Sequence, residues 1–142
     1  MSDEFAIQQV LNTYTYNATI GDLPAMVATF APDGVWEVPG AGIEMTGHDA
    51  ILAAAKGITG VLEYMTQMNS PAIIQVDGDR ATAKSVIREC GKYTGRELHL
   101  EVLGAYEDEL VRLPEGWRFA RRRFSTIGMH DYTTAPPALR GG

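Results

Sequence analysis

The sequence predicts an α+β domain in which three N-terminal helices pack inside a strongly curved, mixed, mainly antiparallel sheet. Two observations carry this prediction. Helical periodicity and capping residues are confined to roughly the first 60 residues, whereas alternating apolar and polar residues separated by turn sequences follow from residue 62 onward. Helices that precede a long meander must cover its apolar face, which leaves a cone with one open end.

The first helix is indicated by a single apolar face and an acidic start. Asp3 and Glu4 lie near its beginning, where negative charge is favourable. Its apolar positions recur at helical spacing: Ile7, Val10, Leu11, Tyr14 and Ala18. We expect Tyr14 on the buried side of this helix.

Two shorter helices follow, with a strand between them. The second is expected over 22–30, with Asp22 as its cap and Pro24 in its first turn, and it closes at residues 31–34. A short strand then carries Trp36, and a turn at 39–42 leads to an extended piece at 43–45. The third helix is expected over about 47–56, stopped by Gly57.

Four antiparallel strands are predicted at 62–76, 79–91, 96–112 and 116–127. Asp77-Gly78 is the strongest hairpin signal among the turns that separate them. Ser70-Pro71 is expected to interrupt the first of these strands with a bulge.

Alternation assigns an inner face to two of the strands. In the second strand the apolar row ends at Glu89: Ala81, Ala83, Ser85, Ile87, Glu89. In the third it includes Tyr106 and Asp108: Leu98, Leu100, Val102, Gly104, Tyr106, Asp108. In the last strand, alternation alone leaves the choice of face open, because both faces carry aromatic residues and arginines.

Size and composition indicate one domain. The chain has 142 residues and is 45% hydrophobic, which is enough for a sizeable core. We expect residues 1–130 to form the domain and residues 131–142, with Pro136-Pro137 and Gly141-Gly142, to form a loose C-terminal tail.

Charge and cysteine content argue against several classes of protein. A net charge of -6 argues against a nucleic-acid partner, and the three arginines at 121–123 alternate between strand faces. Cys90 is the single cysteine, which excludes an internal disulfide and fits a reducing cytoplasm. The acidic N-terminus and the lack of a long apolar run predict neither export nor membrane insertion.

Several short patterns, in order along the chain, resemble the SnoaL-like branch of the NTF2-like superfamily. These patterns are Tyr14 with Gly21-Asp22-Leu23, the segment 30–36, Gly47 with Ile51, the segment 76–83, Gly104-x-Tyr106-x-Asp108, and Gly116-Trp117. This group includes polyketide cyclases, ketosteroid isomerases, scytalone dehydratases, a dehydrochlorinase and limonene epoxide hydrolases. The resemblance implies a cone with a deep apolar pocket, a homodimer formed through the outer sheet face, and no required cofactor.

The same resemblance implies roles for individual residues. Tyr14 stands where ketosteroid isomerases have an oxyanion-hole tyrosine. Residues implied to line the pocket are Trp36, Ile87, Glu89, Val102, Tyr106, Arg122 and Phe124, which turns Arg122 inward in the last strand. The catalytic acids and histidine of the relatives are not matched: the corresponding positions are Val38, Thr19 and Gln67.

Glu89 is then the best candidate proton carrier, because a carboxyl at the end of an apolar row is partly desolvated and its pKa rises. If it meets Arg122, the two can instead form a structural ion pair, and both interpretations stand. Tyr14 can donate a hydrogen bond to a carbonyl or enolate oxygen, or be a core tyrosine. Candidate binding residues are Asn17, Trp36, Met65, Gln67, Asn69, Ile87, Val102, Tyr106 and Phe124.

Together with these residues, the resemblance implies a cofactor-independent cyclase, dehydratase or isomerase that acts on a hydrophobic, ring-containing, oxygenated small molecule. No His, Asp and Glu set has ligand spacing, so no metal is expected. Two alternatives remain. One is a non-catalytic ligand-binding or assembly domain that lacks the catalytic dyad. The other is an epoxide hydrolase. Such an enzyme needs an Asp-Arg-Asp arrangement around a water molecule, and of these three residues only the arginine is convincingly inside the cone.

Overall fold

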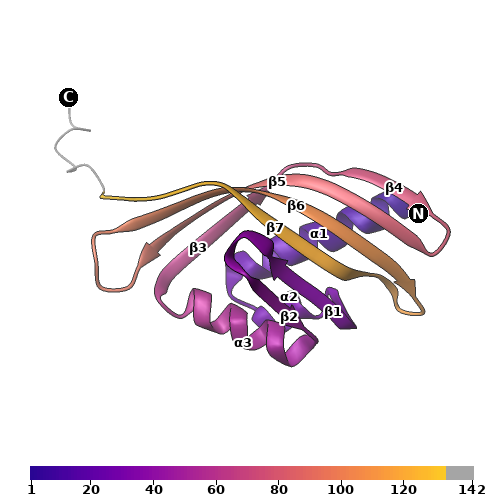
Figure 1. The fold of residues 1–142 in the computed structure, drawn as a ribbon, viewed down its shortest axis with the longest axis horizontal. Helices are drawn as coiled ribbons and strands as arrows, with labels where there is room; N and C mark the ends of the chain where they lie inside the picture. The colour runs from indigo at the N-terminus through magenta and orange to yellow at the C-terminus, as the bar shows by residue number, and fades with distance from the viewer. Residues whose placement is uncertain (134–142) are drawn as a thin grey trace.

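A seven-stranded sheet curls around the long first helix in the computed structural model, which describes residues 1–133 (Figure 1). The elements of this part of the chain are α1 (Asp3–Ile20), α2 (Leu23–Val27), β1 (Phe30–Val38), the 3-10 turn η1 (Pro39–Ala41), β2 (Ile43–Thr46), α3 (His48–Thr59), β3 (Leu62–Asn69), β4 (Ile73–Asp77), β5 (Arg80–Tyr93), β6 (His99–Leu113) and β7 (Gly116–Tyr132).

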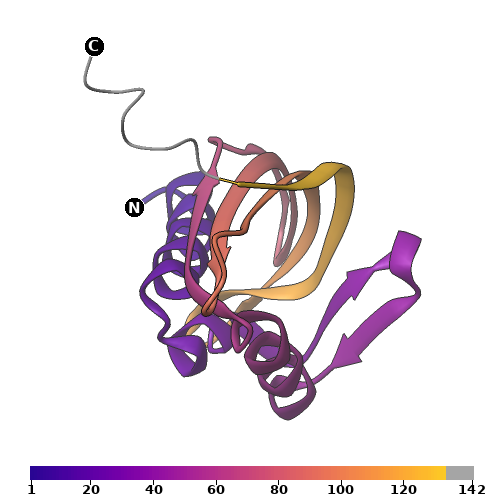
Figure 2. The ribbon, with the colours of Figure 1, turned by 90° about the vertical axis from the view of Figure 1, so that its left-hand side faces the viewer.

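The sheet order is β2-β1-β7-β6-β5-β3, with β4 also pairing with β5. The β1–β7 pair is parallel and the other pairs are antiparallel. Figure 2 shows the sheet bending round from β3, beside α1, to β7, with α3 below it and the β1–β2 hairpin at the right. The predicted cone, with helices inside a mixed, mainly antiparallel sheet, is confirmed.

The buried face of α1 is the predicted one. Ile7, Leu11, Tyr14 and Ala18 are buried, and Val10 is partly buried. Ser2 caps the helix by accepting a hydrogen bond from the backbone N of Phe5, and Gly21 ends it in the left-handed region at φ 82°.

Both shorter helices differ from their predicted ends. α2 stops at Val27, and residues 31–34, expected to form a turn, belong to β1. Phe30 pairs with Phe119 of β7, so sheet pairing draws this segment out of the helix. α3 continues through Gly57 to Thr59, because an isolated glycine is tolerated in a helix and Gly60 caps its end instead.

Ser70-Pro71 breaks the first long strand, as predicted. The break separates β3 from β4, and both still pair with β5. Strand β7 extends to Tyr132, beyond its expected end at residue 127, because Asp131 and Tyr132 pair with Leu100 and His99. The expected tail therefore begins inside a strand, and its residues 134–142 lie outside the described part of the chain.

The inner faces of β5 and β6 are as predicted, and β7 uses both of its candidate faces. Trp117 and Phe119 point inward, and so does Arg122. A register shift between Glu109 and Leu110 inserts Ala120 and reverses the alternation at that point. The bulge explains why strict alternation could not choose one face.

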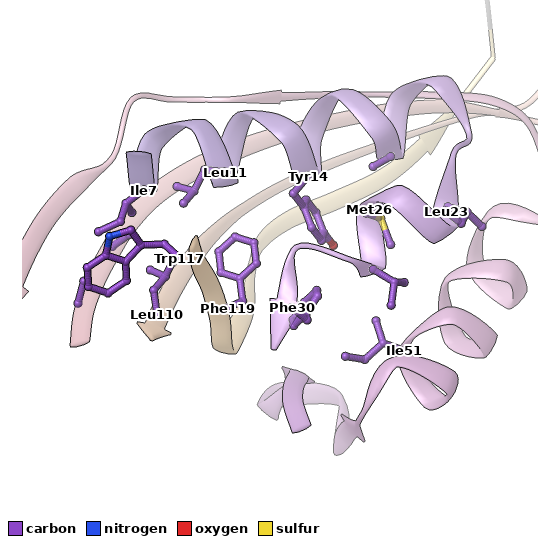
Figure 3. Packing of buried hydrophobic residues seen from close by; sticks show 14 of the residues in the cluster. Ile7, Leu11, Tyr14, Leu23, Met26, Phe30, Ile51, Leu110, Trp117 and Phe119 are labelled. Atoms are coloured by element: carbon purple, nitrogen blue, oxygen red, sulfur yellow. The ribbon is translucent and has the colours of Figure 1, made fainter. Parts of the chain in front are cut away.

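An aromatic cluster forms the centre of the core. Tyr14 makes edge contacts with Phe30 and Phe119, at ring-centroid distances of 6.1 and 5.9 Å (Figure 3). At the start of α1, Arg112 binds Asp3 with two hydrogen bonds of 2.8 Å and stacks on Trp117. The indole of Trp117 also donates to Asp3, so one end of the cone is closed by this cluster.

Gly34 gives a first prediction, because it fits β1 against β7. A Cβ at Gly34 would lie 2.9 Å from the carbonyl O of Phe119 and 3.0 Å from that of Ala31. Backbone atoms yield little, so Gly34→Ala should lower the free energy of unfolding by about 1–3 kcal/mol, measured by urea denaturation. Gly40→Ala, whose Cβ would meet no atom within 4 Å, is the matched control. Equal stability of the two variants would contradict this packing.

Candidate functional site

A cavity of about 270 Å³ lies inside the cone and is lined mainly by apolar side chains. Helices and sheet both contribute to its wall. The lining residues are Tyr14, Ala18, Leu23, Met26, Trp36, Val38, Ile43, Ile51, Ala55, Ile58, Thr59, Met65, Gln67, Glu89, Leu100, Val102, Tyr106, Phe124, Thr126 and Met129. Such a pocket suits a small, flat, apolar ring compound with few polar groups.

Glu89 is the ionisable carboxyl of this wall. It ends the inner row of β5, where it lies opposite Gln67 of β3 and Val102 of β6. Its carboxylate has no hydrogen-bond or ion-pair partner within residues 1–133. Burial raises the pKa of Glu89 to about 7, which leaves it divided between both protonation states at neutral pH.

This pKa shift makes a prediction about stability. The unfolded carboxyl titrates near 4.5 and the folded one near 7, so the folded state binds its proton more tightly and loses stability as the pH rises between these values. Glu89→Gln should therefore match the wild type at pH 4 and exceed it at pH 8, by an amount on the order of 3 kcal/mol. Urea unfolding at both pH values measures the difference. A constant difference across this range would rule out the raised pKa.

Two tyrosine hydroxyls are the other polar groups of special interest. Tyr14 comes from α1 and Tyr106 from β6, and their side chains are hydrogen-bonded to each other. Burial raises the pKa of both phenols, and the cationic Arg122 opposes this rise. Both groups therefore remain protonated at neutral pH and can donate hydrogen bonds.

Arg122 lies behind these phenols, completely buried. Its guanidinium carbon lies 3.6 Å from the ring centroid of Tyr106, 4.2 Å from that of Tyr14 and 4.5 Å from that of Phe119. Its Nε donates a 3.0 Å hydrogen bond to Oδ1 of Asp108. The partner of Arg122 is therefore Asp108 and not Glu89.

Burial raises the pKa of Asp108 to about 6, although the adjacent Arg122 guanidinium acts in the opposite direction. At neutral pH the pair is ionised. Alternation along β6 predicted the inner-facing position of Asp108, but its pairing with Arg122 was not predicted. The signal was available, because the inner-facing Asp108 is an acid on the strand next to the one that carries the inner-facing arginine.

The acid at the end of β1 faces away from the cavity. Glu37 accepts hydrogen bonds or ion pairs from Arg123 at 2.7 Å and Arg121 at 2.9 Å. The next residue, Val38, lines the cavity instead. Alternation along β1 therefore puts an apolar side chain where ketosteroid isomerases were expected to have their base.

Eight of the predicted site residues line the cavity: Tyr14, Trp36, Met65, Gln67, Glu89, Val102, Tyr106 and Phe124. Two of them hold buried polar atoms without a protein partner within the described chain, namely the indole Nε1 of Trp36 and the carbonyl Oε1 of Gln67. An indole N–H can only donate, so Trp36 is suited to an oxygen acceptor on a ligand.

Four predicted residues do not line the cavity: Asn17, Asn69, Ile87 and Arg122. The amide of Asn17 donates to the carbonyl of Thr13 in its own helix. Asn69 donates to the hydroxyl of Ser85, which ties β3 to β5. Ile87 is buried in the sheet wall, and Arg122 is covered by the aromatic rings.

The contribution of β2 and α3 to the site was not predicted from the sequence. Ile43, Ile51, Ala55, Ile58 and Thr59 all line the cavity. Their apolar character was visible, but the way α3 docks across the sheet depends on packing between elements distant in the sequence.

No group of three or more metal-binding side chains occurs within residues 1–133. No helix in this part of the chain has the length and apolarity needed to span a membrane.

Comparison with known proteins identifies similar chains. The sequence profile of the SnoaL-like domain matches residues 1–123. An uncharacterized protein of Mycobacterium tuberculosis is 25% identical over 123 residues, which cover 86% of this chain and 84% of the relative.

Solved structures share the fold. A candidate scytalone dehydratase of Novosphingobium aromaticivorans has a TM-score of 0.81 and 26% identity, with 92% of this chain and 87% of that chain covered. An NTF2-like protein of the same organism has a TM-score of 0.78 and 25% identity, with 98% of this chain and 87% of that chain covered. A hexachlorocyclohexane dehydrochlorinase has a TM-score of 0.81 at 15% identity, with 93% and 92% covered, and shows the fold alone.

Proposed function

Because this chain belongs to the SnoaL-like family, and because its cone holds an unpaired carboxyl in an apolar cavity, we propose that it is a cofactor-independent enzyme of acid–base chemistry. Its substrate is a hydrophobic, ring-containing, oxygenated small molecule, and its reaction is of the cyclase, dehydratase or isomerase kind. The observation that carries the proposal is Glu89, whose pKa of about 7 suits it to take up and return a proton at neutral pH.

The proposed roles follow from the groups that reach the cavity. Glu89 removes a proton from the carbon next to a carbonyl group, which places negative charge on the carbonyl oxygen, and it returns the proton later in the reaction. Tyr14, hydrogen-bonded to Tyr106, donates to the oxygen on which negative charge develops. Trp36 and Phe124 hold the ring system, and Gln67 beside Glu89 supplies an acceptor.

Arg122 acts through the tyrosines in this proposal. Because its guanidinium stacks on both phenol rings, its charge favours the build-up of negative charge on their hydroxyls and strengthens their hydrogen bonds to a substrate oxygen. Asp108 fixes the guanidinium in that place. Arg122 is thus a positioning residue, because the rings separate it from the cavity.

A second candidate is a non-catalytic ligand-binding domain. The favouring observation is Thr19, which stands at a catalytic acid position of the relatives and accepts a hydrogen bond from the backbone N of Gln67. That contact holds α1 against β3 and moves no proton. An epoxide hydrolase is less favoured, because the Arg122–Asp108 pair does not line the cavity and cannot reach a water beside a substrate.

Ligand screening followed by turnover separates the two candidates. Aromatic ketones and polyketide-like compounds should raise the melting temperature, and at least one hit should be converted to product without an added cofactor. Binding without conversion across the hits favours the ligand-binding domain. Failure of all such compounds to bind would sink both candidates.

We also propose a homodimer formed through the outer sheet face, in a reducing cytoplasm. The dimer is supported by three exposed apolar residues on that face, Met68, Val86 and Leu103. The reducing cytoplasm is supported by Cys90, which is a free thiol. Sedimentation of the wild type and of Val86→Lys, which puts a charge in this patch, tests the dimer. A monomeric wild type would contradict it.

A further inference from the structure

Gly104 occupies a place where any side chain would collide with the pocket wall. It lies on the inner face of β6 between Val102 and Tyr106, and it is buried. A Cβ at this position would overlap Cε2 and Cζ of Phe124 and lie 3.0 Å from the carbonyl O of Ser125. Its φ is not in the left-handed region, so space and not backbone conformation calls for glycine here.

Phe124 makes use of this space. It pairs in register with Tyr106, and its ring leans diagonally over Gly104, the next inner position of β6. The rings of Phe124 and Tyr106 are 5.3 Å apart and tilted by 60°. The ring therefore lies close to the β6 backbone at Gly104, and it also forms part of the cavity wall.

A bulge lies next to this pair. Leu103 pairs with Gly128 and Gly104 pairs with Thr126, so β7 has one extra residue, Ile127, at this point. Glycine inside a strand weakens it, because the residue has no side chain to pack. The close approach of the Phe124 ring offsets this loss.

We propose that Gly104 is a specificity-determining residue: by letting the outer end of the Phe124 ring approach the β6 backbone, it sets the width of the cavity and admits a ligand with two fused rings. Only the class of ligand in this inference rests on the proposed function. The contact between Gly104 and Phe124 is a property of the protein itself. With a Cβ at position 104 the ring must swing away from β6 and into the cavity, because Tyr106 stands on its other side.

The test compares Gly104→Ala with Gly128→Ala. Gly128 lies on β7, one pairing step from Gly104, and its Cβ would meet no atom within 4 Å. In a crystal structure of Gly104→Ala the Phe124 ring should be displaced into a smaller cavity, whereas Gly128→Ala should keep both unchanged. An unmoved Phe124 ring would overturn the proposal, and this readout needs no ligand.

Ligand binding supplies the second readout. For Gly104→Ala, the Kd of 1-tetralone, an aryl ketone with two fused rings, should rise at least about tenfold, and that of the one-ring acetophenone by less than about threefold. Unchanged binding of 1-tetralone would overturn the proposal. If the wild type bound neither ketone, the ligand assigned to the cavity would be wrong, whereas the proposed function fails only if every compound of the ligand screen fails to bind. The crystal structure decides the role of Gly104 in either case.

A double variant guards against simple misfolding. Phe124→Leu removes the ring that collides, so Gly104→Ala should cost less stability in the Phe124→Leu background than in the wild type. The double variant should also regain 1-tetralone binding relative to Gly104→Ala alone. Equal and additive losses in both backgrounds would contradict a contact between residues 104 and 124.

Discussion

Glu89→Gln should lower kcat/KM by about 10²–10⁴-fold for the screened compound that the wild type converts to product. The Kd of the variant for this compound should change by less than about threefold. Glutamine keeps the shape of the side chain and its hydrogen-bonding capacity, but it cannot take up a proton. Glu89 is the one carboxyl among the described residues that line the cavity, so no other described carboxyl there can take over its role. Steady-state kinetics and calorimetry measure the two effects separately.

The pH profile of the wild type makes this expectation stricter. If Glu89 acts as the base, kcat/KM should rise with pH through an apparent pKa near 7, where the folded carboxyl titrates. This limb should be missing in Glu89→Gln. Glu107→Gln, an exposed acid on the outer face of β6, is the matched control and should keep the wild-type rate and profile. A Glu89→Gln variant with wild-type turnover would remove Glu89 from the mechanism.

Breaking the Arg122–Asp108 pair should cause the largest loss of stability, about 3–5 kcal/mol for Asp108→Asn. Both side chains are inaccessible to solvent, with an Nε to Oδ1 distance of 3.0 Å. In Asp108→Asn the guanidinium remains charged at both pH values, because arginine does not lose its proton. The wild type itself loses stability as the pH rises, because the pKa of Asp108 is about 6 in the folded state against 3.8 for an ordinary aspartate, so the loss in Asp108→Asn should be smaller at pH 8 than at pH 5. Urea unfolding measures both values.

The reverse variant should behave differently with pH. Arg122→Met leaves Asp108 unpaired in a site where burial already raises its pKa to about 6, against 3.8 for an ordinary aspartate. Without the arginine this pKa rises further. Its protonated form is tolerated, so the loss should be smaller at pH 5 and grow as the pH rises to 8. A pH-independent loss for Arg122→Met would contradict this account.

Two further variants separate the pair from its surroundings. Arg122→Met combined with Asp108→Leu removes both charges and should recover much of the lost stability. Arg88→Met breaks an exposed ion pair on the outer sheet face and should have a much smaller effect than either buried substitution.

The fold was predictable because its elements have strong local signals. The apolar face of α1 and the Asp77-Gly78 hairpin were both read correctly from spacing and turn chemistry. Element ends were harder, since pairing of Phe30 with Phe119 ends α2 early and converts the expected turn into β1. A contact between residues so far apart in the sequence leaves no local trace.

The site was predictable where strands alternate regularly. Alternation along β5 placed Glu89 on the inner face, and the cavity confirms that position. In β7 the bulge at Ala120 reverses the faces, so the inward direction of Arg122 followed from family resemblance and not from alternation. The wall made by α3 and the collision that keeps residue 104 a glycine depend on packing, which periodicity does not describe.

The central claim is that Glu89 is a desolvated carboxyl able to exchange a proton near neutral pH. A carbon-13 NMR titration of the glutamate side chains, with the Glu89 signal assigned by its loss in Glu89→Gln, tests this claim without any ligand. The structure predicts a midpoint of about 7 for Glu89. A midpoint at the ordinary value of 4.5 would show a carboxylate that is fully ionised at neutral pH, and would contradict the proposed role.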